Sequence, residues 1–207
     1  MYSRTVLFFV KLGFKVAQIN YRGSLGISKE YVNQLAGQVG DLDVKDCIAA
    51  INNLIALNLI DKQNVSIWGG SHGGFLVCHL VGQYPEFGFA SCTALNPVVD
   101  MSKMFAVTDI PDWCLIETFG NDVETYKRLN NWSTENNLVK QLNRLIDVGQ
   151  PEVLRAMFEK SPMQHVDRVK TPVLMILGRI DQRVPHYQGL SFVNALKMRN
   201  VETQCYM

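Results

Sequence analysis

One serine of this sequence is surrounded by glycines and follows directly on a short apolar run. It occurs in SIWGGSHGGFL, residues 66–76. Four glycines flank it: Gly69, Gly70, Gly73 and Gly74. The motif fits the pattern G-x-S-x-G, in which a strand turns sharply into a helix and exposes the serine hydroxyl. Glycines are expected there because a side chain beside the serine would collide with the neighbouring strand and helix. Ser71 is therefore a candidate nucleophile.

Three other interpretations of this glycine-rich turn stay open: a phosphate-binding loop, a serine that caps a helix, and a chance match. A phosphate loop of the Walker type needs Lys followed by Ser or Thr after the glycines, and that dipeptide is absent here. A capping role for Ser71 is compatible with a catalytic one. Residues 64–70 predict a strand and residues 71–84 predict a helix, so the context favours a nucleophile.

Length, charge and hydropathy narrow the class of protein. The 207 residues suffice for one domain with a buried core, and 47% hydrophobic with 19% charged residues is typical of a globular protein. A net charge of +1 without a basic patch argues against nucleic acid as a partner. The apolar run at residues 5–10 is broken by Lys11, and no stretch approaches the roughly 18 apolar residues of a membrane span. No membrane association is expected.

Five scattered cysteines predict free, mostly buried thiols in a cytoplasmic protein, because their odd number and spacing fit neither a disulfide framework nor a zinc site. Three aspartates, Asp41, Asp43 and Asp46, lie within six residues at the start of a helical pattern. Their spacing differs from that of a calcium-binding loop, so helix capping is favoured over metal binding. The sequence therefore predicts neither a metal nor a cofactor.

Short apolar runs alternate with amphipathic segments along most of the chain. Strands are expected within residues 14–20, 64–70, 89–97, 171–178 and 201–207. Helices are expected within residues 39–57, 71–84 and 186–200. Strands that alternate with helices indicate right-handed crossovers and an α/β fold with a mostly parallel sheet. The apolar character of the strands predicts helices on both faces of that sheet.

The alternation loosens between residues 98 and 170, where aromatic residues and two helical patterns, at 137–148 and 151–161, replace it. We expect a helical excursion over the carboxyl edge of the sheet, which is where α/β folds bind ligands. A satellite helical core without ligand contact is the alternative.

A serine nucleophile needs a base, and the base needs an orienting carboxylate. In this kind of fold the carboxylate and then the histidine follow the serine along the chain. Asp181, in LGRIDQRVP just beyond a predicted strand, fits the carboxylate, whereas its alternative role is that of a turn aspartate.

The base is harder to find among the four histidines. His72, His79 and His165 precede Asp181, and His186 follows it by only five residues. His186 is expected on a surface or loop, because five residues cannot cross a helix and another strand. The triad histidine is therefore expected beyond Met207.

Several segments together resemble the acylaminoacyl-peptidases (acylpeptide hydrolases) of the prolyl oligopeptidase family. The resemblance rests on INYRGSLG, GGSHGGF, DIPDW and DQRVP at their present separations, runs from Met1 to Met207, and is loosest around residues 118–150. It implies an α/β-hydrolase fold in which Ser71 is the nucleophile, Asp181 the triad acid, and the backbone N–H of His72 half of the oxyanion hole.

The resemblance also implies a reaction and its limits. The family hydrolyses the bond after an N-acylated first residue of short peptides through an acyl-enzyme. Its amino-terminal propeller, its His-Gly-Gly-Pro segment and its terminal histidine have no counterpart in residues 1–207. The chain is thus expected to be a partial catalytic domain, incomplete at both ends and weak or inactive alone, with homo-oligomers forming through an unpaired sheet edge. A carboxylesterase or lipase, or a non-catalytic fragment, are the alternatives.

Overall fold

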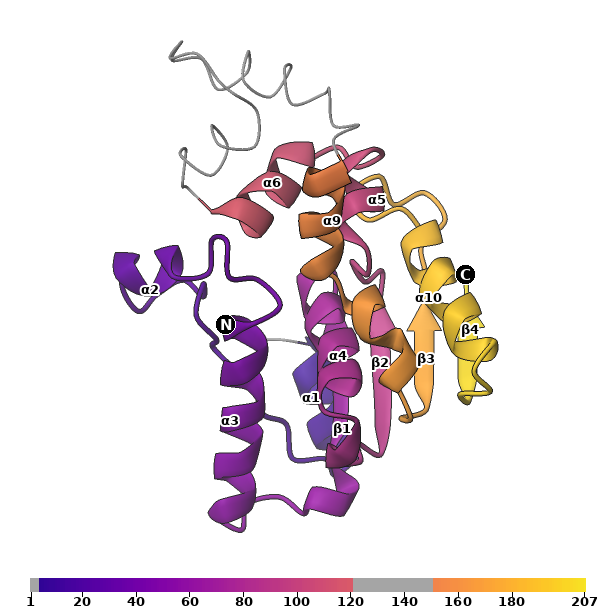
Figure 1. Ribbon diagram of the computed structural model, residues 1–207. Coiled ribbons are helices and arrows are strands. Elements are labelled where there is room, and N and C mark those ends of the chain that lie inside the picture. The colour runs from indigo at the N-terminus through magenta and orange to yellow at the C-terminus, as the bar shows by residue number, and fades with distance from the viewer. Residues whose placement is uncertain (1–3, 121–150) are drawn as a thin grey trace.

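Four parallel strands form the sheet of this protein, whose structure is a computed structural model that describes residues 4–120 and 151–207. In chain order and in the order of the sheet they are β1 (Ser66–Gly70), β2 (Ser91–Leu95), β3 (Val173–Ile176) and β4 (Thr203–Tyr206). Each strand pairs in parallel with the next one (Figure 1). The α/β fold and the parallel sheet predicted from the sequence are confirmed for these strands.

One face of the sheet is well covered by helices. The main ones are α3 (Leu42–Ala56), α4 (His72–Gln83), α10 (Tyr187–Lys197) and the 3-10 helix η3 (Pro162–Arg168). Gly69 of β1 and Met175 of β3 lie on this face. A Cβ added to Gly69 would meet the backbone of α4, and a Cβ added to Gly189 of α10 would meet the sulfur of Met175. Figure 1 shows α4 and α10 in front of the strands and α3 to the left, beside α4. The helix predicted at residues 39–57 is confirmed as α3.

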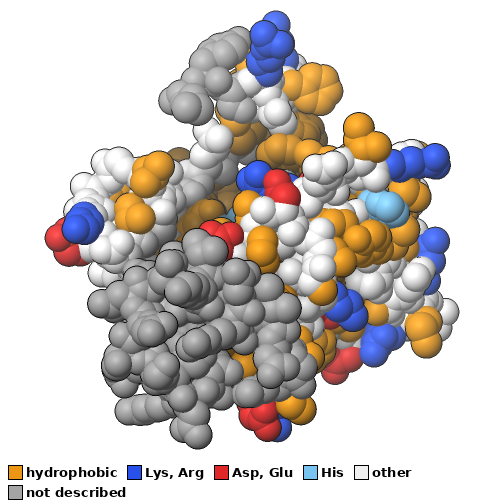
Figure 2. Space-filling view, turned by 90° about the horizontal axis from the view of Figure 1, so that it is seen from above, with side chains coloured by type: hydrophobic (Ala, Val, Ile, Leu, Met, Phe, Trp, Pro, Cys, Tyr) orange, Lys and Arg blue, Asp and Glu red, His pale blue; other side chains and the backbone are white. Residues whose placement is uncertain are grey.

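The opposite face carries α1 (Arg4–Lys11), whose Phe9 ring lies 6.5 Å from the ring of Trp68 in β1. Helices therefore occur on both faces, as expected, but the cover is uneven. Leu95, Ile176 and Tyr206 are register partners on this second face and remain 37%, 37% and 62% exposed. The exposed side chains of α1 are also largely apolar. Figure 2, seen from above, shows further apolar side chains scattered over that surface of the molecule. The strands consequently alternate between buried and exposed residues.

The strand predicted at residues 14–20 is wrong. The segment has no strand assignment, and within the described ranges no backbone hydrogen bond joins it to the free edge of β1. A cavity of about 600 Å³ is lined by residues 14–19 on one side and by β1 on the other. An apolar run forms a strand only where a neighbour satisfies its N–H and C=O groups, and here that neighbour is absent. The chain turns after α1 at Gly13, which has a positive φ of 91°.

The described part of the excursion is helical and lies above the carboxyl ends of the strands (Figure 1). It contains α5 (Met101–Phe105), α6 (Pro111–Phe119) and α9 (Pro151–Glu159). The helix pattern at 137–148 lies outside the described residues. Shorter helices elsewhere are α2 (Lys29–Asn33), η1 (Lys62–Asn64) and η2 (Pro85–Phe87). The structure thus has helices at residues 101–105, 111–119 and 151–159 in this region, whereas η3 packs against α4 on the face of the sheet.

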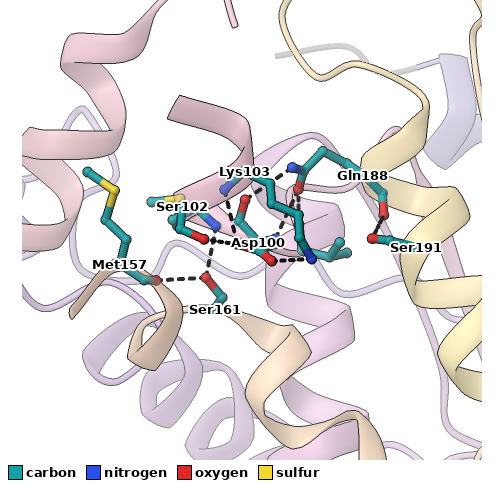
Figure 3. Close-up of polar contacts among 9 residues, drawn as sticks. Asp100, Ser102, Lys103, Met157, Ser161, Gln188 and Ser191 are labelled. Atoms are coloured by element: carbon teal, nitrogen blue, oxygen red, sulfur yellow. Dashed lines mark hydrogen bonds and ion pairs between the residues drawn. The ribbon is translucent and has the colours of Figure 1, made fainter. Parts of the chain in front are cut away.

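A buried polar network connects this excursion to the sheet and to α10 (Figure 3). The side-chain oxygen of Gln188 accepts the backbone N–H groups of Val99 (3.0 Å) and Asp100 (2.9 Å), and its amide donates to the Asp100 carbonyl (3.1 Å). Ser161 accepts the N–H of Met101 (2.8 Å) and donates to a carbonyl of α9 (2.7 Å). Gln188, Asp100 and Ser161 are nearly or fully buried. The segment that follows β2 is thus hydrogen-bonded to α10 through Gln188 and to α9 through Ser161.

The cysteines agree with the expectation of free, mostly buried thiols. All five cysteines are free, and only Cys205 is partly exposed. Within residues 4–120 and 151–207, no helix has an apolar stretch long enough to cross a bilayer.

Candidate active site

Ser71 lies between the last residue of β1 and the first residue of α4, in a strained backbone conformation. Its φ of 55° and ψ of −119° fall outside the regions that a non-glycine residue usually adopts. Its N–H donates to the carbonyl of Leu95 (2.9 Å), and its own carbonyl accepts the N–H of Phe75 (3.0 Å). The residue is exposed, and its hydroxyl makes no capping hydrogen bond. The capping interpretation is wrong for this hydroxyl.

The four glycines around Ser71 are not equally constrained. A Cβ on Gly69 would lie 2.1 Å from the carbonyl oxygen of Gly73, and one on Gly74 would lie 2.8 Å from Pro97. A Cβ on Gly70 would make ordinary contacts at 3.6 Å, and one on Gly73 would meet nothing within 4 Å. The predicted steric reason for the glycines is therefore confirmed at Gly69 and Gly74. It is wrong at Gly70 and Gly73, because their missing side chains would point into free or normally packed space.

Asp181 lies five residues beyond β3, at the same carboxyl edge of the sheet as Ser71. Its Oδ1 accepts the backbone N–H groups of Arg183 (2.9 Å) and Val184 (2.9 Å), which is a turn-forming pattern. Its Oδ2 has no hydrogen-bond partner in the described part of the chain. One carboxylate oxygen thus builds the loop while the other is available for an imidazole, so the turn and triad roles are compatible.

An ion pair that the sequence analysis missed holds the Asp181 loop against the excursion. The Arg183 guanidinium bonds both carboxylate oxygens of Asp109, at 2.6 Å and 3.0 Å, and the Arg183 carbonyl accepts the hydroxyl of Thr108 (2.7 Å). The hydrogen bond from Arg183 holds the pKa of the Asp109 carboxyl below its ordinary value. Residues 108–109 precede α6, so the loop position depends on a segment 74 residues away.

His72 makes a second contact that the sequence analysis missed. Its Nε2 lies 3.2 Å from Oδ2 of Asp43, a fully buried residue of α3. The sequence analysis assigned only the backbone N–H of His72 to the site and treated Asp43 as a capping residue. That backbone N–H has no acceptor in the described part of the structure. Nothing in the spacing of two residues 29 positions apart signals their contact.

The surroundings of His72 are partly shielded from water. Burial, and then the charge of Asp43, raise the pKa of the Tyr21 hydroxyl to about 12. Burial also raises the pKa of Glu117 in α6, against a smaller opposite effect of His72. One carboxyl oxygen of Glu117 is buried and has no hydrogen-bond partner among the described residues. Desolvation therefore dominates the electrostatics beside the turn and strengthens the hydrogen bonds made there.

No described histidine bonds Ser71 or Asp181. His79 is buried in α4, where its Nε2 donates to the Lys160 carbonyl (3.2 Å) and its Nδ1 accepts from the amide of Gln83 (2.8 Å). His186 directly precedes α10 and is half-buried, with its ring 5.2 Å from Tyr187. The expectation that the base lies beyond Met207 therefore stays a prediction.

His79 makes stability depend on pH. Burial lowers its pKa from 6.5 to about 3, so the folded state resists its protonation. The contribution of neutral His79 to the free energy of unfolding is complete above pH 6.5. It is lost as the pH falls below that value, at about 1.4 kcal/mol per pH unit. We expect His79→Gln, which can keep both hydrogen bonds, to flatten the fall in the free energy of unfolding between pH 6.5 and 4. Urea denaturation at several pH values measures this, and parallel curves for both proteins would contradict it.

Metal binding finds no support in the described residues. Among residues 4–120 and 151–207, no three His, Cys, Asp or Glu side chains are grouped to hold a metal ion. Asp41 pairs with Lys45 (2.7 Å) and Asp46 with Arg22 (2.6 Å), so these carboxylates have other partners. Asp41 precedes α3 but makes no side-chain cap, whereas Asp43 accepts the N–H of Gly40 (2.8 Å). Capping is thus confirmed for Asp43 and wrong for Asp41.

Comparison with known proteins identifies the family. The sequence profile of the prolyl oligopeptidase family matches residues 1–151 and 141–207. The chain belongs to this family. Among its members, the acylamino-acid-releasing enzyme of Mus musculus is 43% identical over 191 residues, and that of Arabidopsis thaliana is 37% identical over 203 residues. The alignments cover 92% and 98% of this chain but only 23% and 24% of those enzymes, so the chain spans about a quarter of their length.

The fold of the family agrees with the structure. Acylaminoacyl peptidase of Pyrococcus horikoshii superposes with a TM-score of 0.70 at 23% identity, over 90% of this chain and 26% of that chain. The predicted α/β-hydrolase fold of a prolyl oligopeptidase family member is therefore confirmed, and the chain corresponds to part of one.

Proposed function

We propose that this chain carries the nucleophile and the acid of a serine hydrolase of the acylaminoacyl-peptidase kind. The observation that carries the proposal is the exposed Ser71, held with a positive φ between a strand and a helix whose first N–H has no acceptor among the described residues. In the proposed reaction, Ser71 Oγ attacks the carbonyl of the scissile bond and loses its proton to a histidine base. The N–H of His72 stabilises the oxyanion, and the scissile C–N bond breaks as the protonated base gives its proton to the leaving amine. Water, activated by the same base, then attacks the acyl-enzyme and releases the acylated residue and the free Ser71 hydroxyl.

Asp181 is proposed as the carboxylate that orients this base. Its Oδ2 is available, whereas Oδ1 is used by the loop. The base itself is proposed to come from outside residues 1–207, which makes weak turnover the expectation for this chain alone. Turnover at the rate of an ordinary peptidase would instead require a described histidine such as His186 as the base.

The proposed substrates are short peptides with an N-acylated first residue, since the mouse and Arabidopsis relatives are named acylamino-acid-releasing enzymes. We also propose that residues 1–207 are part of one catalytic domain and that the protein is cytoplasmic, in keeping with its five free thiols. Self-association through the edge of β4 that does not pair with β3 is proposed as well, and light scattering at rising concentration tests it.

Covalent labelling of Ser71 tests the proposed nucleophile. A fluorophosphonate probe is expected to label the protein at Ser71, and Ser71→Ala is expected to lower the labelling rate at least about 1,000-fold. Ser66→Ala is the matched control, since Ser66 lies in β1, the strand that leads to Ser71, and only its hydroxyl contact with Ser91 is lost. Equal labelling of Ser71→Ala and the unmodified protein would reject the nucleophile.

The acyl group transferred to the serine decides between the two hydrolase classes. Release of the first residue from an N-acetylated peptide, even slowly, supports the peptidase. Hydrolysis of acyl esters alone would favour the carboxylesterase. Hydrolysis of neither substrate would favour a non-catalytic fragment.

A further inference from the structure

Asp43 is a buried carboxylate whose hydrogen bonds lead to the turn that carries Ser71. It is fully buried near the start of α3, and its Oδ1 accepts the N–H groups of Gly40 (2.8 Å) and Val44 (2.9 Å). Within residues 4–120 and 151–207, its Oδ2 has one partner, Nε2 of His72 at 3.2 Å. Because an ionised carboxylate only accepts hydrogen bonds, Nε2 carries the proton of this contact. Loss of the imidazole would leave a buried charged oxygen unpaired, which is costly.

The ring of His72 is also fixed on its faces and at its edge. Tyr21 and Phe75 stack on it with ring centroids 5.7 Å and 5.3 Å away, and Trp113 of α6 meets it edge-on at 6.0 Å. Three elements therefore enclose the ring, and Asp43 sets its rotation within that enclosure. Few orientations of the imidazole satisfy all four neighbours at once.

A fixed side chain at position 72 constrains the backbone beside it. The strained conformation of Ser71 persists only where the surrounding structure over-determines it. Upstream, the N–H of Ser71 is held by the Leu95 carbonyl (2.9 Å). Downstream, the first side chain with a fixed position is that of His72. We propose that Asp43 is a positioning residue that holds, through His72, the backbone N–H proposed to stabilise the oxyanion. This inference rests on the proposed function of Ser71.

The two other aspartates nearby do not share this role. Asp41, which directly precedes α3, pairs with Lys45 in the first turn of that helix, and the two side chains are 42% and 58% exposed. Asp46 forms its ion pair with Arg22 (2.6 Å). Neither carboxylate has a hydrogen bond to His72 in the described part of the chain. Asp41 therefore offers a matched control, because its removal takes a negative charge from the same helix turn without touching the imidazole.

A double-mutant cycle tests whether Asp43 acts through His72. We expect Asp43→Ala to slow fluorophosphonate labelling of Ser71 about 10- to 100-fold, since a displaced oxyanion donor loses much of its effect. In the His72→Phe background, which keeps an aromatic ring in the enclosure, the same substitution is expected to change the rate less than about twofold. Asp41→Ala is expected to stay within about twofold of the unmodified protein. Equal slowing in both backgrounds would overturn the proposal.

A conservative variant separates positioning from a general loss of structure. Asp43→Asn keeps the acceptor for Gly40 and Val44 and places an N–H₂ group opposite Nε2, so the imidazole proton should move to Nδ1. We expect the ¹⁵N shifts of His72 to report this change of tautomer, while the labelling rate stays within about threefold. A labelling loss in Asp43→Asn as large as that in Asp43→Ala would also contradict positioning by the hydrogen bond.

Hydrogen exchange decides the proposal even if Ser71 proves unreactive. The N–H of Phe75 donates to the Ser71 carbonyl (3.0 Å) and reports the closure of the turn. Asp43→Ala is expected to speed exchange of this amide at least about tenfold, and Asp41→Ala is expected to leave it unchanged. Absence of labelling in the unmodified protein would refute the proposed nucleophile alone. Unchanged Phe75 exchange in Asp43→Ala would overturn the positioning role itself.

Discussion

Gly69→Ala is expected to lower the free energy of unfolding by about 3 kcal/mol or more and to abolish labelling at Ser71. The added methyl group would lie 2.1 Å from the Gly73 carbonyl oxygen, which is backbone at the start of α4. No side chain can rotate away to relieve that contact, so either β1 or α4 must move. Since Ser71 lies between these two elements, movement of either one changes the direction of its hydroxyl.

Gly73→Ala is the matched control, because it alters the other glycine of the G-x-S-x-G pattern. The added methyl group meets nothing within 4 Å, and Gly73 lies within α4. Alanine is therefore expected to be neutral or to stabilise the helix by up to about 1 kcal/mol. Urea denaturation and the labelling rate measure both variants. A similar loss in the two variants would show that the contact at Gly69 is not the cause.

The elements of the sheet were predictable because their sequence patterns are local. The glycine-rich turn and the apolar runs around it place β1, Ser71 and α4 without any tertiary information. The helical spacing of residues 39–57 likewise predicts α3, whose buried face includes Val44 and Ile51. Each of these patterns reports which side chains face the core, and that requires only the period of the element.

The strand predicted at residues 14–20 fails for the opposite reason. Its apolar residues fit a strand, but strand formation depends on a neighbour in space, and the edge of β1 stays unpaired beside a cavity. Glycine roles are non-local too: the same motif contains Gly69, which allows no side chain, and Gly73, which has open space around it. The pattern G-x-S-x-G requires glycine at both positions and does not show which of them has space for a side chain.

The candidate site was predictable only in part. Ser71 and Asp181 follow strands, so their place at one sheet edge could be inferred. The bond between Asp43 and His72 could not, because it joins two helices that come together only in the folded chain. The pairing of Arg183 with Asp109 depends in the same way on the path of the excursion. Contacts between side chains of distant segments carry no signature in a single sequence.

Gln188→Leu is expected to cost about 2–5 kcal/mol of the free energy of unfolding, the second large effect that the structure predicts. Leucine has a similar size but leaves the buried N–H groups of Val99 and Asp100 without an acceptor, and each unpaired group costs about 1–3 kcal/mol. The Asp100 carbonyl loses the amide of Gln188 as a donor in addition. Guanidinium denaturation of the two proteins at neutral pH measures the difference.

Ser191→Ala provides the comparison within the same network (Figure 3). Ser191 donates one hydrogen bond to the Gln188 carbonyl (2.7 Å), so its loss is expected to cost less than about 1 kcal/mol. Because Gln188 lies in the helix that follows the Asp181 loop and bonds the chain leaving β2, its loss should also speed hydrogen exchange at Val99 and Asp100. Equal destabilisation by Gln188→Leu and Ser191→Ala would show that the backbone N–H groups find other acceptors, and that the sheet edge bearing the candidate site does not depend on this network.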